Sequence, residues 1–253
     1  YVAEPYRRAN TRVDLQQLWH RIATLEERVA ALGSAGVVPC AEEEAARRLL
    51  SQAVDAAEAL DPDTARSLLE RLEREHPNTQ AGRSIDRLRQ ELEIVGRPEA
   101  PLQLEGWIQG RTDHQPDAPT LYVFWELWCP RCQRELPRLQ PLLDHHQDQG
   151  LQILALTRMT RDVERVEVQR FLAEHGLSFP VALDSDGALS QHYGVRGIPA
   201  AAMVVGGSVI WRGHPAHLDD ELIERFLDAR WGPGPPGTAP GTAPGAAPGG
   251  QQL

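Results

Sequence analysis

A Cys-Pro-Arg-Cys sequence constrains this chain more than any other feature. The run before it, residues 121–125, is apolar, aromatic and β-branched, and this composition predicts a buried strand. The stretch after it, residues 133–149, carries leucines at helical spacing. We therefore expect Cys129 and Cys132 where a strand turns into the first turn of a helix.

This position favours redox chemistry at the cysteine pair. Unpaired backbone N–H groups and the helix dipole stabilise a thiolate at a helix N-terminus, and Arg131 adds positive charge. Cys129, nearer the helix start, is the expected nucleophile, and Cys132, one turn further, is its resolving partner. The alternative is half of a zinc site, which needs two more ligands. Cys40 stands alone and no His pair completes a set, so we predict neither a metal nor a cofactor.

The residues around the pair resemble a known family. Residues 124–132, followed by Glu135-Leu136-Pro137, resemble the active-site segment of TlpA-like (ResA-like) thiol–disulfide oxidoreductases. These are thioredoxin-superfamily proteins of the bacterial cell envelope. The sequence Gly197-Ile198-Pro199 lies where that family places a cis-proline facing the cysteines. The resemblance covers about residues 101–231.

The resemblance implies an α/β thioredoxin fold, with a central mixed sheet flanked by helices. Residues 176–181 and 184–187 resemble the family's helix–strand insertion. The pattern further predicts a short hairpin at 102–108, helices at 163–175 and 188–193, a strand hairpin at 201–211 and a closing helix at 218–231.

The resemblance also assigns roles around the cysteines. A cis bond at Pro199 would turn the backbone of Ile198 outward to pair with an extended client peptide. Trp128, Pro130 and Arg131, beside the nucleophile, complete the predicted substrate-binding residues.

Other residues near the pair carry further expectations. Glu135 matches a glutamate that assists proton transfer to the thiols, although it could equally be an ordinary solvated helix residue. Glu126 stands where relatives carry a small residue, and its charge would oppose thiolate formation. Pro137 is expected to kink the active-site helix and Pro141 to break it a second time.

The N-terminal part of the chain predicts three segments before the redox domain. Residues 1–12 form a polar, flexible lead-in. Residues 13–33 carry apolar side chains at alternating steps of three and four, which favours a parallel coiled-coil dimer, although a trimer or a helix packed on its own chain stays open. Residues 40–97 predict a helical, weakly tetratricopeptide-like module that either docks a partner or acts as a spacer. Cys40, before this module, is either a free thiol or an intermolecular disulfide.

Composition limits the remaining possibilities. The redox domain is predicted at 98–231, and the Gly, Pro, Ala-rich tail at 232–253 is expected to be disordered. The net charge of -10 argues against a nucleic-acid partner. No apolar run is long enough to span a bilayer. The family resemblance implies a periplasmic or outer-face location, with a membrane anchor expected before Tyr1.

These observations predict a cell-envelope protein-disulfide reductase that acts on protein clients, receives electrons from a membrane or periplasmic donor, and self-associates through residues 13–33. An oligomeric isomerase or oxidase is the first alternative, and Arg131 favours it by stabilising the reduced form. A scaffold with dispensable redox activity is the second. A peroxidase is disfavoured because no Pro-x-x-x-Thr-x-x-Cys pattern surrounds either cysteine of the pair.

Overall fold

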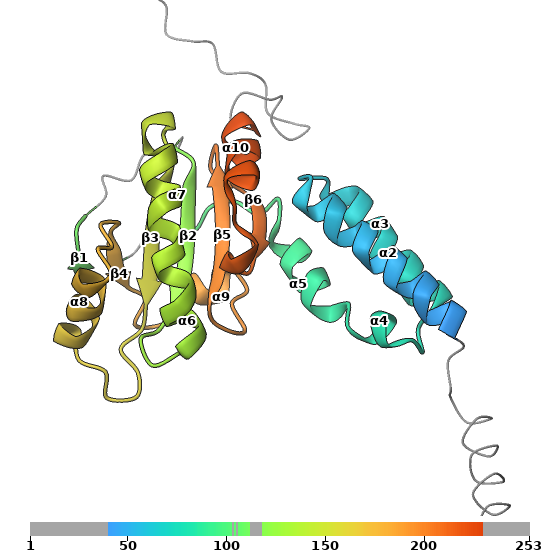
Figure 1. Cartoon of the computed structure of the whole chain (residues 1–253), viewed down its shortest axis with the longest axis horizontal. Coiled ribbons are helices and arrows are strands. Elements are labelled where there is room, and N and C mark those ends of the chain that lie inside the picture. Colours follow the sequence, from blue (N-terminus) through green and yellow to red (C-terminus); the bar gives the residue numbers. More distant parts are fainter. Residues whose placement is uncertain (1–39, 103, 105, 112–117, 230–253) are drawn as a thin grey trace, which may run out of the picture.

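The computed structural model of the chain describes residues 40–102, 104, 106–111 and 118–229 (Figure 1). The predicted lead-in at 1–12, coiled coil at 13–33 and tail at 232–253 lie outside these residues. No described helix combines the length and apolar character needed to cross a bilayer.

A single mixed sheet forms the centre of the molecule, as the sequence predicted. Its spatial order is β1-β4-β3-β2-β5-β6. β2 runs parallel to β3, and β3 parallel to β4, whereas β1, β5 and β6 pair antiparallel with their neighbours. The strands are β1 (Trp107–Gln109), β2 (Thr120–Trp125), β3 (Gln152–Thr157), β4 (Val181–Leu183), β5 (Ala200–Val205) and β6 (Ser208–Gly213).

The central strand β2 is buried along its whole length, which explains its continuous apolar run. Successive side chains point to opposite faces of the sheet. Leu121 and Trp125 pack in one core, whereas Tyr122 and Phe124 pack in a second core on the other face. Tyr122 stacks there on Tyr193, with ring centroids 5.1 Å apart.

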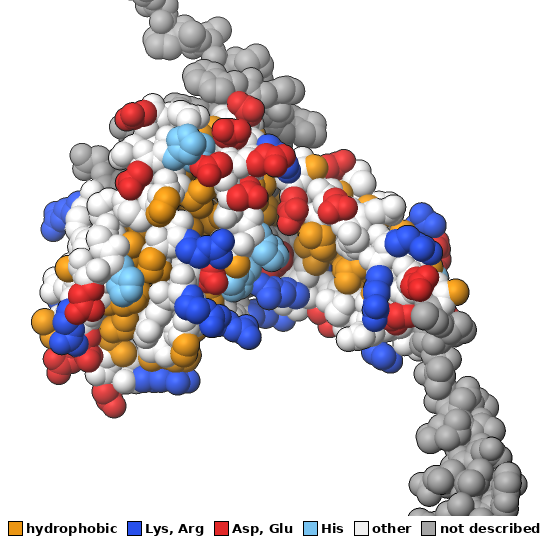
Figure 2. All heavy atoms as spheres, in the orientation of Figure 1, with side chains coloured by type: hydrophobic (Ala, Val, Ile, Leu, Met, Phe, Trp, Pro, Cys, Tyr) orange, Lys and Arg blue, Asp and Glu red, His pale blue; other side chains and the backbone are white. Residues whose placement is uncertain are grey.

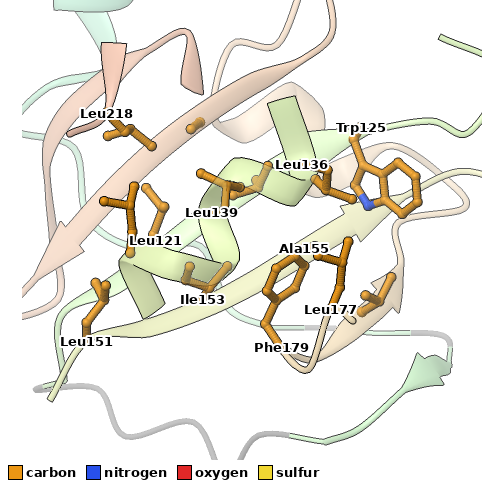
Figure 3. Packing of buried hydrophobic residues seen from close by; sticks show 14 of the residues in the cluster. Leu121, Trp125, Leu136, Leu139, Leu151, Ile153, Ala155, Leu177, Phe179 and Leu218 are labelled. Carbon is orange, nitrogen blue, oxygen red and sulfur yellow. The ribbon is translucent and has the colours of Figure 1, made fainter. Parts of the chain in front are cut away.

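Helices cover the first face, and leucines from the active-site helix fill the space above the sheet (Figure 3). The larger helices of this layer pack through buried apolar side chains that follow a helical period. The helices on this face are α6 (Pro130–Glu135), α7 (Leu139–His146), α8 (Arg165–Glu174) and α10 (Asp220–Ala229).

The active-site helix is interrupted once. α6 passes into a 3-10 turn, Leu136–Arg138, and α7 begins directly after it. Pro137 lies in that turn, as expected for a residue that cannot continue the α-helical hydrogen bonding. The second break predicted at Pro141 was wrong. Pro141 falls in the first turn of α7, where backbone N–H groups have no intrahelical acceptor, so its missing N–H costs no bond.

The second face is covered by α9 (Ala188–His192) and by the segment that leads out of the helical module. That segment runs along the outer edge of β6. Gly96 donates its backbone N–H to Val209, Val209 donates to Arg97, and Glu99 donates to Gly207, at 2.8 to 2.9 Å. The edge strand is therefore paired along these residues, which keeps it from pairing with other chains.

A hairpin was predicted at residues 102–108. In the structure, the end of this stretch pairs with a distant strand instead. β1 pairs with β4 of the insertion, through Trp107 opposite Ala182. Residues 103 and 105 lie outside the described part of the chain, so the first arm is not described. β1 thus extends the sheet beyond the helix–strand insertion.

The helical module comprises α2 (Cys40–Glu58), α3 (Pro62–Glu75), α4 (Gln80–Arg83) and α5 (Asp86–Ile94). Asp61 caps α3 by accepting the backbone N–H of Thr64 at 3.0 Å, which fixes where α3 begins. The short α4 was not predicted. Thr79 caps it, but a capping residue is a weak helix signal where no apolar period follows.

Two contacts fix the module to the redox domain. Ile94 at the end of α5 is buried in the second core, where its side chain lies against Gly194. Arg225 of α10 donates to the backbone carbonyl of Glu58 at 2.9 Å. The module therefore packs beside β6 rather than hanging on a free linker (Figure 1).

Candidate active site

Cys129 and Cys132 lie at the N-terminus of α6, as predicted. Cys129 is the N-cap residue with an extended backbone, and Pro130 occupies the first helical position, where its fixed φ suits a helix start. Cys129 is 7% exposed, and Cys132 is fully buried. Both cysteines are free thiols in this structure. The less buried sulfur is therefore the one that a partner can reach.

The Cys132 thiol resists ionisation. Burial raises the pKa of the Cys132 thiol well above its ordinary value, and the neighbouring Cys129 and the Glu126 charge raise it further. A hydrogen bond from the Glu126 backbone only partly opposes this rise. Cys132 consequently remains a protonated thiol near neutral pH, which leaves Cys129 as the group able to attack.

The second predicted motif faces the first. The peptide bond between Ile198 and Pro199 is cis. The carbonyl oxygen of Ile198 lies 3.8 Å from the Cys129 sulfur, which donates to it. Ile198 is partly exposed and Pro199 is buried at the start of β5. Cys129 and Ile198 thus lie in contact although they are 69 positions apart in the sequence.

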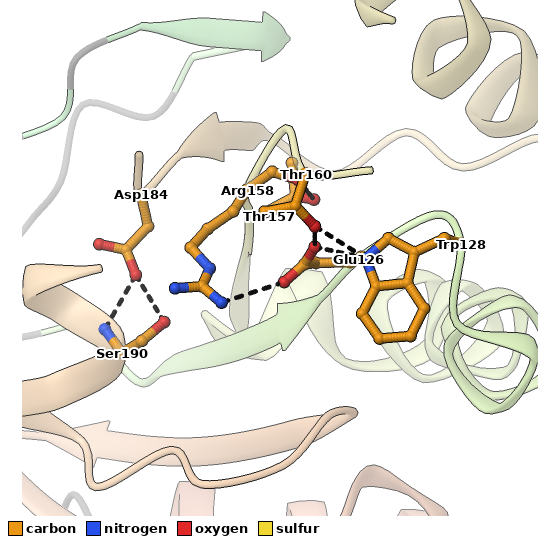
Figure 4. A network of polar contacts seen from close by, with 7 residues as sticks. All are labelled: Glu126, Trp128, Thr157, Arg158, Thr160, Asp184 and Ser190. Carbon is orange, nitrogen blue, oxygen red and sulfur yellow. Dashed lines mark hydrogen bonds and ion pairs between the residues drawn. The ribbon is translucent and has the colours of Figure 1, made fainter. Parts of the chain in front are cut away.

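A partly buried polar network surrounds the Glu126 side chain (Figure 4). The Glu126 carboxylate, 5% exposed, accepts from the Trp128 indole N–H at 2.6 Å and from the Thr160 hydroxyl. Arg158 forms an ion pair with it at 3.3 Å. Glu126 was predicted to place a charge near the site, and the structure places it there with its charge compensated.

Sequence reasoning missed Arg158, Thr160 and Arg161 as neighbours of the site. The Arg161 guanidinium lies 3.5 Å above the centre of the Trp128 ring. These residues follow β3, which is parallel to β2. The ends of adjacent parallel strands meet at one edge of the sheet, and this rule could have identified them.

The structure places the other predicted site residues at different depths. Trp128 is partly buried beside Cys129, whereas Arg131 is exposed on α6. Glu135, one turn after Cys132, is 13% exposed and pairs with Arg138 at 3.0 Å. Glu135 is therefore not a freely solvated helix residue.

A cavity of about 410 Å³ opens next to Cys129. We call it the cysteine pocket. Trp128 and Arg158 form one part of its wall, and Val195 and Ile198 form another. The pocket gives a partner molecule room beside the exposed sulfur.

One group of potential metal ligands occurs within the described residues, away from the cysteines. His145 Nδ1 and His146 Nε2 each lie 2.9 Å from the same Asp220 oxygen. These hydrogen bonds join α7 to α10 and account for all three side chains, so we assign them a structural role.

A dithiol at the start of a helix after the central strand, with a cis-proline opposite, on a six-stranded mixed sheet, defines a thioredoxin-fold thiol–disulfide oxidoreductase. The model of the AhpC/TSA family matches residues 103–212. A solved thioredoxin-like protein in its oxidized form aligns with 53% of this chain and 96% of its own, at 23% identity and a TM-score of 0.46.

Curated relatives identify the family. The thiol–disulfide oxidoreductase ResA of Geobacillus thermodenitrificans is 32% identical over 126 residues, which cover 50% of this chain and 70% of that protein. ResA of Halalkalibacterium halodurans is 30% identical over 105 residues, 42% of this chain and 58% of that protein. The chain belongs to the ResA-like thiol–disulfide oxidoreductases of the thioredoxin superfamily.

Proposed function

We propose that this chain is a cell-envelope protein-disulfide reductase that uses Cys129 and Cys132. The observation that carries the proposal is the contrast between the two thiols, one reachable beside the cis-proline and one buried with a raised pKa. The raised pKa of Cys132 means that the reduced form gains no thiolate stabilisation at this cysteine, which favours the disulfide form and makes the pair a better reductant.

The reaction proceeds in two exchanges. The Cys129 thiolate attacks one sulfur of a client disulfide, which forms a mixed disulfide and releases one client thiolate. Cys132, once deprotonated, attacks the Cys129 sulfur, which closes the internal disulfide and releases the second client thiolate. The client gains two electrons and the Cys129–Cys132 pair loses them.

Other residues are proposed to orient the client and move protons. The Ile198 backbone, beside the Cys129 sulfur, is proposed to pair with an extended client segment. Trp128, Pro130 and Arg131 border the same approach. Glu135 is proposed to carry the proton that Cys132 must lose, because it lies one helical turn away and is largely buried.

A reduction potential measured by equilibration with glutathione tests the direction of electron flow. A value at or below roughly -230 mV supports the reductase. A value of about -120 to -180 mV would contradict it and favour the oxidase or isomerase, towards which the exposed Arg131 beside Cys129 points.

The roles of the two cysteines are tested with a disulfide-bonded peptide. Cys132→Ser should accumulate a mixed disulfide on Cys129, because the resolving thiol is gone. Cys129→Ser should accumulate none, since Cys132 is fully buried. The double variant should have no exchange activity. Full biological activity of that double variant would instead favour the scaffold function.

The family supports the proposed location and electron donor, and the heptad pattern supports the proposed self-association. We propose a periplasmic or outer-face location with an N-terminal membrane anchor, an upstream membrane or periplasmic electron donor, and self-association through residues 13–33. Protease accessibility in intact spheroplasts would test the location, since a domain on the outer face is degraded without lysis.

A further inference from the structure

A second cavity, of about 230 Å³, lies between the cis-proline segment and helix α5 of the helical module. Arg87 and Glu91 of α5 line one side, and Ile198 and Pro199 line the other. We call this cavity the arginine groove. Its charged lining residues are Arg87, Glu91, Arg131, Arg196 and Arg212.

The arginine groove is continuous with the site of exchange. It shares Arg196, Gly197 and Ile198 with the cysteine pocket, so the two cavities lie on either side of one short segment. A client strand that pairs with the Ile198 backbone would therefore place neighbouring residues of the client against the groove.

Positive charge dominates this groove. Four of its lining residues are arginines, and its one carboxylate, Glu91, pairs with Arg87 at 3.0 Å. Figure 2 shows a group of basic side chains where the redox domain meets the helical module. The groove thus keeps a net positive charge in a chain whose net charge is -10.

Arg212 lines the groove as a buried charged side chain. Its side chain is 8% exposed, and its Nε and Nη1 atoms donate to the backbone carbonyls of Tyr193, Ala201 and Gly213. Burial lowers the pKa of Arg212 to about 10, so it remains charged at neutral pH. Within the described residues, no carboxylate forms an ion pair with it, although the charge of Glu91 in the same groove favours its charged form and that of Arg87 opposes it. A buried cation of this kind is stabilised by an anionic ligand.

We propose that the arginine groove binds an acidic segment of the client protein beside its disulfide, so that the helical module helps to select the client. This inference rests on the proposed reductase function. A peptide carboxylate suits the groove because a client strand at Ile198 leads into it, and because guanidinium groups pair well with carboxylates.

Binding is tested on the full-length oxidised protein with fluorescent peptides in which serine replaces each cysteine. Three matched peptides carry Asp, Asn or Arg beside the serine, and anisotropy gives each Kd. We expect the Asp peptide to bind about 10-fold more tightly than the Asn peptide at low salt. The difference should shrink at high salt, because salt screens charge interactions beyond about 3 Å at 1 M.

Charge-reversal variants test whether the Asp peptide binds in the arginine groove. Arg87→Glu and Arg196→Glu should each remove most of the preference for the Asp peptide. Both side chains are exposed, so the fold should persist, and circular dichroism checks this. Arg83→Glu is the matched control, since it makes the same charge change on an exposed residue of the module outside the groove. Arg83→Glu should keep the preference.

The outcomes separate this inference from the proposed function. Equal binding of the Asp and Asn peptides, or an equal loss in Arg83→Glu, would overturn the inference. Inorganic phosphate that displaces the Asp peptide at the peptide's own Kd would also overturn it, because the groove would then be a simple anion site. The corresponding disulfide-bonded peptides test the redox step separately. If none is reduced, the reductase proposal fails. The serine peptides still show whether the arginine groove binds an acidic segment.

Discussion

The charge of Glu126 contributes to the raised pKa of Cys132. The Glu126 carboxylate is held by Trp128, Thr160 and Arg158. A small residue at this position would remove that contribution to the pKa, so Glu126 favours a reducing dithiol in this chain.

The substitution Glu126→Gln should therefore lower the pKa of Cys132 and make the reduction potential less negative. The amide still accepts from Trp128 and Thr160, so the network should remain. Glutathione equilibration measures the potential, and thiolate absorbance against pH follows the thiols. Glu174→Gln, an exposed residue of α8, is the control. A potential equal to that of the unsubstituted protein in Glu126→Gln would contradict this role.

Glu135 is proposed to take the proton from Cys132. Glu135→Gln keeps the size of the side chain and removes its ability to accept a proton, so resolution of the mixed disulfide should slow by about 10²-fold. Stopped-flow tryptophan fluorescence provides the rate. Arg138→Gln breaks the same ion pair without removing the carboxylate and should change the rate little. Equal effects of the two variants would indicate that Glu135 is only structural.

His214 should make stability depend on pH. Burial lowers the pKa of His214 below its ordinary value of 6.5, and Arg87 adds to the shift. Its Nδ1 accepts the Ala216 backbone N–H at 3.1 Å, which requires an unprotonated atom. The unfolded chain therefore binds this proton more readily, and stability is lost as the pH falls below 6.5 towards the folded-state pKa.

Replacement of this histidine by asparagine tests that dependence. His214→Asn keeps an acceptor for Ala216 and removes the titrating ring. Urea unfolding between about pH 7 and pH 5 should show a smaller loss of stability in the variant than in the unsubstituted protein. His192→Asn, which replaces a partly exposed histidine of α9, is the control. Identical slopes for His214→Asn and the unsubstituted protein would refute the assignment.

At the scale of elements, the end of α5 is held by its contact with the turn after α9. Gly194 has a φ of +60, and a Cβ atom there would lie 2.8 Å from Ile94 Cδ1. The glycine thus serves two needs, a left-handed backbone and a close approach of the helical module. This contact positions α5 beside the cis-proline segment and so forms the arginine groove.

Gly194→Ala should destabilise the protein by about 2 kcal/mol or more, from backbone strain and overpacking together. Gly176→Ala separates these causes, because Gly176 has a similar φ of +63 and open space around its Cβ position. Gly176→Ala should destabilise the protein less than Gly194→Ala does. Ile94→Val removes the clashing methyl group, so in the double variant Gly194→Ala should cost less than it does alone. Chemical denaturation gives these values, and strict additivity would contradict the predicted contact.

At the scale of the whole molecule, the helical module and the redox domain form one packed unit. The segment after α5 pairs with β6, and Arg225 bonds to the end of α2. The module therefore lies close enough to the dithiol to affect which clients reach it. Residues 13–33, outside the described residues, remain a predicted parallel coiled coil.

That coiled coil can be tested in the full chain. Leu18→Asp with Leu25→Asp places charges at two predicted core positions, so the double variant should be monomeric. Light scattering should give twice the single-chain mass for the unsubstituted protein. Gln17→Asp with Thr24→Asp adds the same charge outside the predicted seam and should leave the mass unchanged. A monomeric unsubstituted protein would refute the prediction.

The sequence by itself determined the fold class, the dithiol and most element positions. These depend on local signals: the buried run before Cys129 and the apolar period after it. The Gly197-Ile198-Pro199 motif identified the facing segment through the resemblance. Such signals can be read from the sequence because neighbouring residues in the chain determine strand, helix and turn geometry.

Only the tertiary structure decided what surrounds the dithiol. Arg158 compensates Glu126 because two parallel strands end at one edge of the sheet. Arg87 reaches the cis-proline segment because Ile94 and Gly194 pack closely. These residues are distant in sequence, and no local period links them. Their proximity depends on how separate elements pack, which is why the sequence predicted the reacting thiols but not the arginines that other elements bring to them.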